Sequence, residues 1–439
     1  MRPDLIQPER LLVFCDGTWC GPETGTRTNI QMLAEMVGID MKTESKELHD
    51  PSRNLKAKYF DGIGLGSTFL AYLFNGSTAN DIASMCSEVY EFIAYNFKKD
   101  TEIWMFGLSR GAYTVRCVAG MINNCGIVKR PSDDLCNQVY RIYSSPYVED
   151  KPDSEQSTTF RKEASWDDVT PIKFLGLFDT VGSIGLPNID AGNGPMYPTL
   201  WDQIVPSVVD KVYHACSLHD RLSVFQPCLT RYSKKENKQR PRPDITEHWF
   251  PGCHYDLGRQ RFKFLRQNAS GVEYWLSLIP NRLSGTLDPN EVLSDLVLRW
   301  MLQSIASEYP HQTVITTIKA EIHGLDDSIK TVQRGTGSGD VYEKWEPYIP
   351  FGSILSHIPV PGLLTETIKL LLAIRDRRIP DDKAVIYPYK QPYSESSPPI
   401  SKLGRVTSQR YPSRTEEVFE AWRAYFPLVD ASKKRVNGN

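Results

Sequence analysis

The sequence MFGLSRGAYTVR, residues 105–116, decides the fold that we predict for this chain. It places Ser109 between Gly107 and Gly111 in a G-x-S-x-G pattern, with an apolar run before it and a helix-like run after it. This arrangement is typical of a nucleophile elbow, in which a strand turns so sharply into a helix that the serine takes strained backbone angles. Small residues are needed two positions before and after the serine because the chain folds over itself there. The alternative is a serine in an ordinary tight turn.

Short apolar runs alternate with amphipathic segments on both sides of this stretch. We predict buried strands at residues 10–17 and 102–107 and a strand followed by a turn at 172–182 and at 247–258. Helices are predicted at 80–97, 111–126, 213–225 and 290–309. The helix at 213–225 would carry His214 and His219 as structural residues. Strands that alternate with helices indicate an α/β fold, with a mainly parallel sheet covered by helices on both faces.

The chain of 439 residues changes character after residue 310. Residues 8–310 are predicted to form the α/β domain, in which a basic segment at 229–246 is a solvated loop. Residues 311–439 are predicted to form a C-terminal extension, helical and rich in Pro and Ser, that is packed on or tethered to the first domain. Its predicted helices lie at 359–378 and 414–426.

Composition excludes several classes of protein. With 51 Lys and Arg against 53 Asp and Glu, the net charge of −2 provides no basic surface for nucleic acid. The nine scattered cysteines form no C-x-x-C pair, so we expect no metal site and no redox pair, but buried thiols in a reducing compartment. The N-terminus does not resemble a signal peptide, and no apolar stretch reaches the roughly 18 residues that span a bilayer. We expect a cytoplasmic protein that needs no cofactor and no obligate protein partner.

Polar residues of catalytic types follow several of the predicted strands. Ligands bind at the carboxyl ends of parallel strands, so these residues should converge there. A serine hydroxyl needs a base to take its proton, and the base needs an acid to orient it. His254 is the predicted base because it follows a strand downstream of Ser109. Asp179, which ends another strand, is the preferred acid, and two further carboxylates remain open as rivals, Asp220 and Asp256.

An ester-cleaving serine also requires backbone N–H donors for the oxyanion. One is expected from Arg110, and a second from the turn at Gly17 and Thr18, with Asp16 as a bracing residue. The side chain of Arg110 either pairs with an acid and locks the elbow, which we favour, or contacts an anionic substrate group such as phosphate.

Six segments occur in this order: RLLVFCDGTW, GLSRGAYTVR, FLGLFDTVGSIG, HACSLHDRLSVF, HWFPGCHYDLG and LSDLVLRWML. Together they resemble the uncharacterised α/β-hydrolase family of bacteria and fungi that includes the catalytic domain of type VI secretion phospholipase effectors. The resemblance covers roughly residues 10–310. It implies an α/β-hydrolase fold and a Ser-Asp-His triad acting on ester bonds, carried here by Ser109, Asp179 and His254. The bacterial effectors of the family are phospholipases.

The chain departs from the family pattern at several positions. Leu108 replaces a phenylalanine in the elbow, and in the histidine turn Tyr255 replaces a serine and Arg259 a glycine. His219 stands where an aspartate is usual and is followed by Asp220, which would have to act from a neighbouring position.

Two functions from different classes follow from these residues. The first is a serine esterase or lipase, with phospholipase activity included, that takes a small-molecule or lipid ester. The second is a non-catalytic α/β-hydrolase-fold protein that binds a ligand or a partner, which a Ser109–His254 distance beyond roughly 5 Å would favour. A third idea is peripheral membrane contact through residues 363–378 and the basic loop at 233–242.

Overall fold

A computed structural model describes most of the α/β domain and parts of the C-terminal extension. The described residues are 8–17, 25, 27–62, 78–167, 171–181, 204–220, 225, 227–232, 242–263, 286–310, 314–331, 337–338, 377 and 385–386. The predicted helices at 359–378 and 414–426 and most of the basic loop lie outside these ranges, apart from Arg377.

The centre of the fold is a sheet of eight strands in the order β10-β7-β6-β5-β4-β1-β3-β2. Only β2, at one edge, runs antiparallel to its neighbour, whereas the other paired strands are parallel. The strands are β1 (Arg10–Cys15), β2 (Glu47–Asp50), β3 (Leu55–Phe60), β4 (Glu102–Leu108), β5 (Ile172–Phe178), β6 (Val209–Ser217), β7 (Asp244–Phe250) and β10 (Val385–Ile386). A separate short pair joins β8 (Phe262–Lys263) and β9 (Thr286–Leu287).

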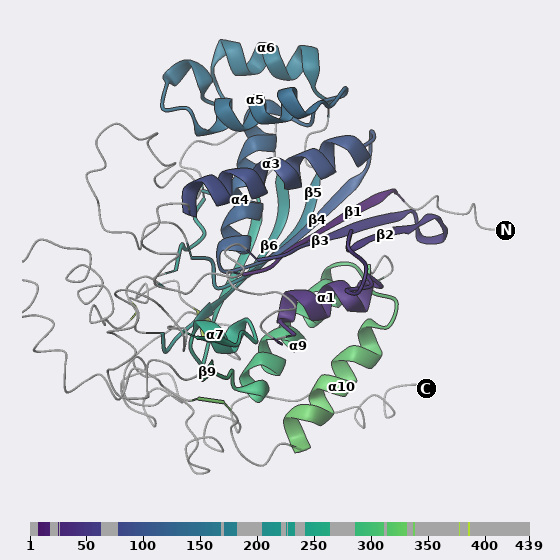
Figure 1. Cartoon of the computed structure of the whole chain (residues 1–439), viewed down its shortest axis with the longest axis vertical. Helices are drawn as coiled ribbons and strands as arrows, with labels where there is room; N and C mark the ends of the chain where they lie inside the picture. The colour runs from purple at the N-terminus through teal and green to yellow at the C-terminus, as the bar shows by residue number, and fades with distance from the viewer. Residues whose placement is uncertain are drawn as a thin grey trace, which may run out of the picture.

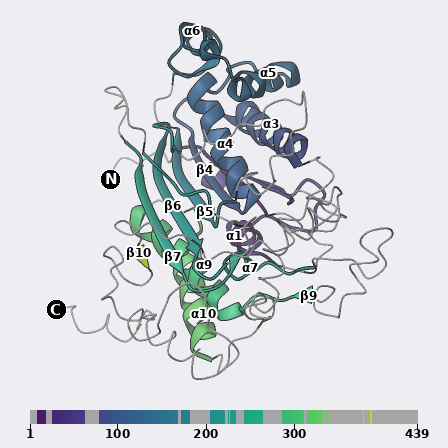
Figure 2. The same cartoon turned by 90° about the vertical axis from the view of Figure 1, so that its left-hand side faces the viewer.

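Helices cover both faces of this sheet, as Figures 1 and 2 show. On one face lie α3 (Thr78–Asn96) and α4 (Arg110–Cys125), with α5 (Asp133–Ser144) and α6 (Glu155–Ala164) outside them. On the other lie α1 (Asn29–Val37), α9 (Glu291–Glu308) and α10 (Ile318–Thr331). The short elements are α7 (His254–Leu257), η2 (Pro51–Arg53) and η3 (Val148–Asp150). The predicted α/β fold is therefore confirmed.

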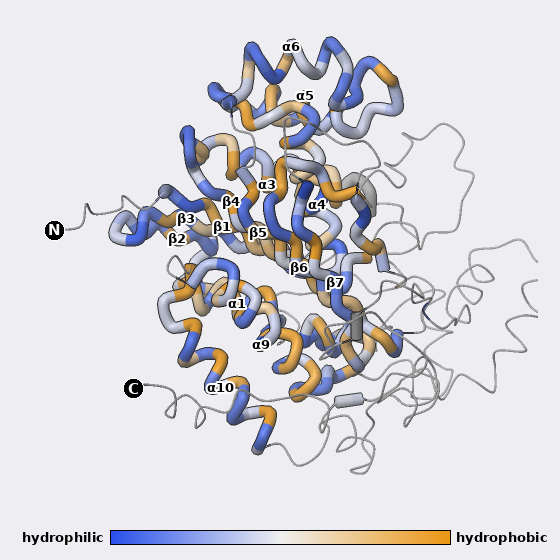
Figure 3. The backbone as a smooth tube through the Cα atoms, turned by 180° about the vertical axis from the view of Figure 1, so that it is seen from behind, coloured by the Kyte–Doolittle hydropathy of each residue, from blue (hydrophilic) through white to orange (hydrophobic). Residues whose placement is uncertain are grey.

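The core is formed where the sheet meets these helices. Hydrophobic residues dominate the central strands, whereas the outlying helix α6 is largely hydrophilic (Figure 3). Aromatic rings run across the sheet from β1 to β6, with centroids 5.2–5.6 Å apart, through Phe14, Phe106, Phe174 and Tyr213. Offset rings at such distances add to the free energy gained by burial, and the run holds the four strands in register.

One of the predicted helices is wrong. Residues 213–217 lie in β6, a central strand that pairs with β5 and β7, and Asp220 follows in the loop after it. A short apolar run does not distinguish a fully buried strand from a buried helix by its periodicity. Pairing on both sides makes the strand the stable choice here. The correction places His214 inside the sheet and His219 at its carboxyl edge.

The elbow predicted at residues 105–116 is a sharp turn between β4 and α4. Ser109 has φ of 56° and ψ of −119°, a conformation that is unfavourable for a residue with a side chain. A Cβ atom on Gly107 would lie 2.5 Å from Ala112 Cα, and one on Gly111 would lie 2.2 Å from the carbonyl oxygen of Cys15. The two glycines are therefore required because backbone occupies the space of their side chains.

This close approach predicts the effect of adding one methyl group. Gly111→Ala should lower the free energy of unfolding by about 1–3 kcal/mol, because two strand-end carbonyls must move. Gly324→Ala is the control, since nothing lies within 4 Å of a Cβ there and α10 is exposed at that position. It should raise stability by about 0.5–1 kcal/mol, as alanine generally does in helices. Urea unfolding measures both, and equal midpoints for wild type and Gly111→Ala would contradict the packing described.

Candidate active site

Ser109, His254 and Asp179 lie in one hydrogen-bonded row at the carboxyl end of the sheet. The Nε2 atom of His254 lies 2.9 Å from Ser109 Oγ, and its Nδ1 atom lies 2.6 Å from Asp179 Oδ2. All three residues are buried. The structure thus brings together the three residues that the sequence singled out, although 145 positions separate serine from histidine.

Ser109 and Asp179 are each placed by the end of a strand. Ser109 follows β4, and its backbone N–H donates to the carbonyl of Phe178 at the end of β5. Asp179 comes next and has a positive φ of 43°, so the serine and the acid both sit in strained conformations. Such strain persists only where the surroundings fix the backbone. Here Asp179 N–H donates to Ala215 O at 2.7 Å, which ties the turn to β6.

The imidazole of His254 is held from its face as well as from its edges. His254 is the first residue of α7, and the ring of Phe225 stacks on it with centroids 4.6 Å apart and planes 15° apart. The backbone N–H of His254 donates to Asp220 Oδ2 at 3.0 Å. These contacts fix the ring orientation so that both nitrogens point along the row.

The carboxylate of Asp179 is fully buried and is nevertheless held in its charged form. Burial by itself raises the pKa of this group, but the guanidinium of Arg377 and the hydrogen bond with His254 outweigh it and lower the pKa below its ordinary value. The N–H and hydroxyl of Ser217 also donate to the two carboxylate oxygens, at 2.9 and 3.3 Å. An ionised Asp179 can therefore accept a hydrogen bond from Nδ1–H of His254 and orient the ring.

The two rival carboxylates are engaged elsewhere. Asp256 accepts from the N–H groups of Cys253 and Asn290, both at 2.7 Å, and so fixes the start of α7. Asp220 accepts the backbone N–H of His254, and burial raises its pKa. Asp179 forms the hydrogen bond with Nδ1 of the imidazole ring. The positions of Asp220 and Asp256 are suited to stabilising the turn that carries His254.

The turn after β1 supports the elbow. Asp16 accepts from Thr28 and Tyr59, each at 2.5 Å, which agrees with a bracing role. Its other carboxylate oxygen accepts the N–H of Gly17 at 2.7 Å, and Thr18 lies outside the described residues. Arg110 is the first residue of α4, so its backbone amide lies at the helix N-terminus beside Ser109, and its side chain is partly exposed.

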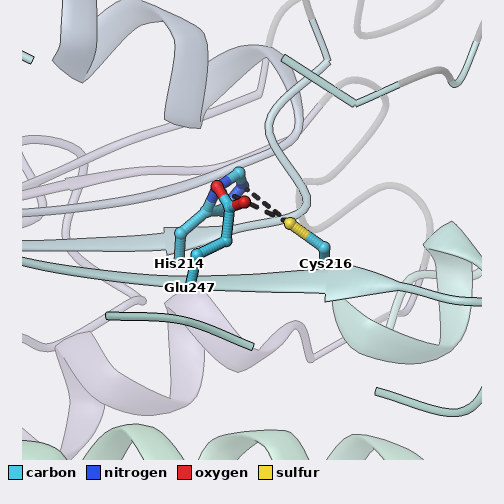
Figure 4. Close-up of side chains that lie close together, drawn as sticks. All are labelled: His214, Cys216 and Glu247. Carbon is cyan, nitrogen blue, oxygen red and sulfur yellow. Dashed lines mark hydrogen bonds and ion pairs between the residues drawn. The ribbon is translucent and has the colours of Figure 1, made fainter. Parts of the chain in front are cut away.

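A compact group of ligand-type side chains lies on β6 and β7 (Figure 4). The ligand atoms of His214, Cys216 and Glu247 fall within 4.8 Å of one another. Both nitrogens of His214 are already engaged, however, Nδ1 with Glu247 at 2.9 Å and Nε2 as acceptor of the Thr180 N–H at 3.2 Å. Through these bonds His214 connects Glu247 on β7 to the backbone just after Asp179.

Three neighbours of the row were not found by sequence reasoning. Ser217, Phe225 and Arg377 all surround Asp179 or His254, yet none stands in a pattern that indicates catalysis. Arg259, noted as a departure from the family glycine, has a positive φ of 53°. Its guanidinium is bound by Asp295 and by Asn29 Oδ1, from α9 and α1. The backbone at Arg259 thus keeps a left-handed conformation that glycine favours, although this residue carries a long side chain.

A comparison with protein families identifies the family of the chain. Residues 9–304 match the family model described as T6SS, phospholipase effector Tle1-like, catalytic domain. The chain belongs to this Tle1-like family. The α/β-hydrolase-like fold is the fold of the family.

Two individual proteins can be placed beside this Tle1-like chain. The uncharacterised protein YEL023C of Saccharomyces cerevisiae is 32% identical over 288 residues, which are 60% of this chain and 40% of that protein. The chain therefore spans less than half the length of this relative. A crystal structure of an uncharacterised protein from Pseudomonas aeruginosa aligns with a TM-score of 0.34 and 13% identity, covering 81% of this chain and 55% of that one. In the part of the chain that the structure describes, no helix is long and apolar enough to cross a membrane.

The backbone of Arg259 predicts a difference between two substitutions. Arg259→Gly and Arg259→Ala both lose the ion pair with Asp295, but only glycine adopts a positive φ without a steric penalty. The alanine variant should therefore be less stable than the glycine variant by about 1 kcal/mol in urea unfolding. An alanine variant as stable as the glycine variant would contradict the left-handed backbone at this position.

Proposed function

We propose that this protein is a serine hydrolase that cleaves carboxylic ester bonds, with Ser109 as nucleophile, His254 as base and Asp179 as acid. The observation that carries the proposal is the row from Ser109 Oγ through both nitrogens of His254 to Asp179, at 2.9 and 2.6 Å. These distances lie within hydrogen-bond reach, which proton transfer in catalysis requires. The same contact argues against the non-catalytic alternative, which a long serine–histidine distance would have favoured.

The first half of the reaction follows from the direction of these contacts. His254 Nε2 takes the proton of Ser109 as the Oγ atom attacks the ester carbonyl and forms a tetrahedral intermediate. The imidazolium that results is stabilised by the buried carboxylate of Asp179. Collapse of the intermediate breaks the bond to the leaving alcohol, and His254 returns the proton to its oxygen. The acyl group remains on Ser109.

The second half repeats these steps with water. His254 removes a proton from the water that attacks the acyl carbonyl, and the acid is released as Ser109 regains its proton. In both halves the oxyanion needs preorganised donors. The amide of Arg110 at the start of α4 is the donor that we propose, assisted by the helix dipole. Gly17 donates to Asp16 instead, and would contribute only after releasing that bond.

The class of substrate follows from the family rather than from the row itself. The matched family is that of a phospholipase effector catalytic domain, so we propose a lipid ester, with phospholipids first among the candidates. Contact with a membrane surface would bring such a substrate to the carboxyl edge of the sheet.

An active-site probe tests the mechanism without knowledge of the substrate. A fluorophosphonate should label wild-type protein on Ser109, and Ser109→Ala should not be labelled. Asp179→Asn should slow labelling by about 10⁴-fold, because the base loses its orienting acid. Ser304→Ala, a buried serine that donates to Trp300 O in α9, is the matched control and should label like wild type. Failure to label Ser109, with a known hydrolase labelled in parallel, would contradict the proposal.

A substrate panel distinguishes lipid esters from soluble ones. Carboxylic esters of increasing acyl length and phospholipid vesicles should be compared for release of fatty acid, each with Ser109→Ala as the blank. We expect release from phospholipid that depends on Ser109. Activity confined to short soluble esters would retain the serine mechanism and exclude the lipid substrate.

A further inference from the structure

Arg377, from the C-terminal extension, forms a buried ion pair with the proposed acid, Asp179. Its Nη1 atom donates to Asp179 Oδ1 at 2.6 Å and its Nη2 atom to Asp179 Oδ2 at 2.8 Å, so the two groups form a bidentate pair. Neither side chain is accessible to solvent. A planar guanidinium fits a carboxylate in this way and fixes its orientation, which a lysine cannot do.

The same guanidinium ties together the surroundings of the imidazole. Its Nη1 atom also donates to the carbonyl of Ser217 at 2.9 Å, at the end of β6, and its Nη2 atom to the carbonyl of Phe225. Phe225 in turn stacks on His254. One side chain thus holds both the acid on the Nδ1 side of the ring and the aromatic residue on its face.

This arginine stands outside the part of the chain that defines the family. The family match ends at residue 304, and Arg377 lies 198 positions after Asp179. The extension also contributes β10, which pairs with β7, and α10, which packs on α9. The extension therefore contacts the edge of the sheet through β10, helix α9 through α10, and the active site through Arg377.

We propose that Arg377 is a positioning residue of the active site, so that the C-terminal extension completes the Ser109–His254–Asp179 row. This inference rests on the proposed function. Arg377 contacts Asp179 and the carbonyls of Ser217 and Phe225. It acts through Asp179, by holding a buried carboxylate ionised and aimed at Nδ1.

The positive charge of Arg377 determines how removal of this side chain should change the pH dependence of activity. Among the residues that the structure describes, the charged and titratable groups that act on Asp179 include Arg377, His254, Asp220 and Cys216. Arg377 is the permanent cation among them, and an adjacent arginine generally lowers a carboxyl pKa by about 1–3 units. Without it, burial raises the pKa of Asp179, and the Asp179–His254 pair takes up a proton at higher pH. On the acid side of the pH profile, activity should then begin to fall at a higher pH than in wild type. It should not decrease by the same factor at every pH.

The test uses the full-length chain with three substitutions. Arg377→Met removes the charge, and Arg377→Lys retains it without the bidentate geometry. Arg299→Lys is the matched control, because Arg299 forms an equally buried pair with Asp326, 2.8 Å apart, between α9 and α10. For each variant we would measure the pH dependence of fluorophosphonate labelling of Ser109, together with thermal unfolding.

We expect Arg377→Met to label about 10²-fold more slowly at neutral pH, a loss typical of a misplaced catalytic group. The acid limb of its profile should move up by about 1–3 pH units. Arg377→Lys should lose rate while keeping the acid limb near that of wild type. Arg299→Lys should lower the unfolding temperature without moving the limb. A uniform loss of rate in Arg377→Met, with its limb unmoved, would overturn the proposal.

A second measurement keeps this inference separate from the proposed function. The proton between His254 Nδ1 and Asp179 should give a low-field ¹H NMR resonance in wild type and in Ser109→Ala, whether or not the protein hydrolyses esters. Arg377→Met should lose or shift this resonance, and Arg299→Lys should retain it. An unchanged resonance in folded Arg377→Met would overturn the positioning role. Absent labelling of wild type with the resonance intact would instead contradict the proposed function alone.

Discussion

A charged carboxylate buried at the end of β5 is the interaction on which the site depends. Removing an ion from water is costly unless it is paired and fully hydrogen-bonded, and Asp179 meets this condition through Arg377, Ser217 and His254. The turn that carries it is strained, with a positive φ, and is fixed in turn by β6. The sheet, the loop after β6 and the C-terminal extension therefore all converge on one carboxylate.

The second constraint is the elbow, which depends on steric fit and not on charge. Backbone atoms occupy the positions that side chains of Gly107 and Gly111 would take. The turn from β4 into α4 is therefore tight, and Ser109 lies in this turn and not in the strand. Leu108 packs against Gly258, because a Cβ atom added to Gly258 would lie 2.6 Å from the methyl carbons of Leu108. The elbow and the histidine turn thus pack directly on each other, which sets the distance from Ser109 to His254.

Local patterns were sufficient to predict some of this. The glycine spacing and the apolar run before Ser109 predicted the elbow, because its demands are met within a few residues. Strand ends pointed to Asp179 and His254, since parallel strands bring their carboxyl ends together. The sequence predicts a helix at residues 213–217 where the structure has a strand, because a strand buried on both faces has no period-two pattern. Arg377 could not be predicted, because its partner lies 198 positions away and its neighbours in sequence resemble an ordinary helix.

The most direct test of the central claim is to trap the covalent intermediate. A slowly hydrolysed activated ester should be mixed with the protein, quenched within the first turnover and mapped by peptide mass spectrometry. We predict an acyl adduct on the peptide that contains Ser109, which disappears in Ser109→Ala together with hydrolysis. Hydrolysis that persists in Ser109→Ala, or an adduct on another residue with Ser109 unmodified, would contradict this account.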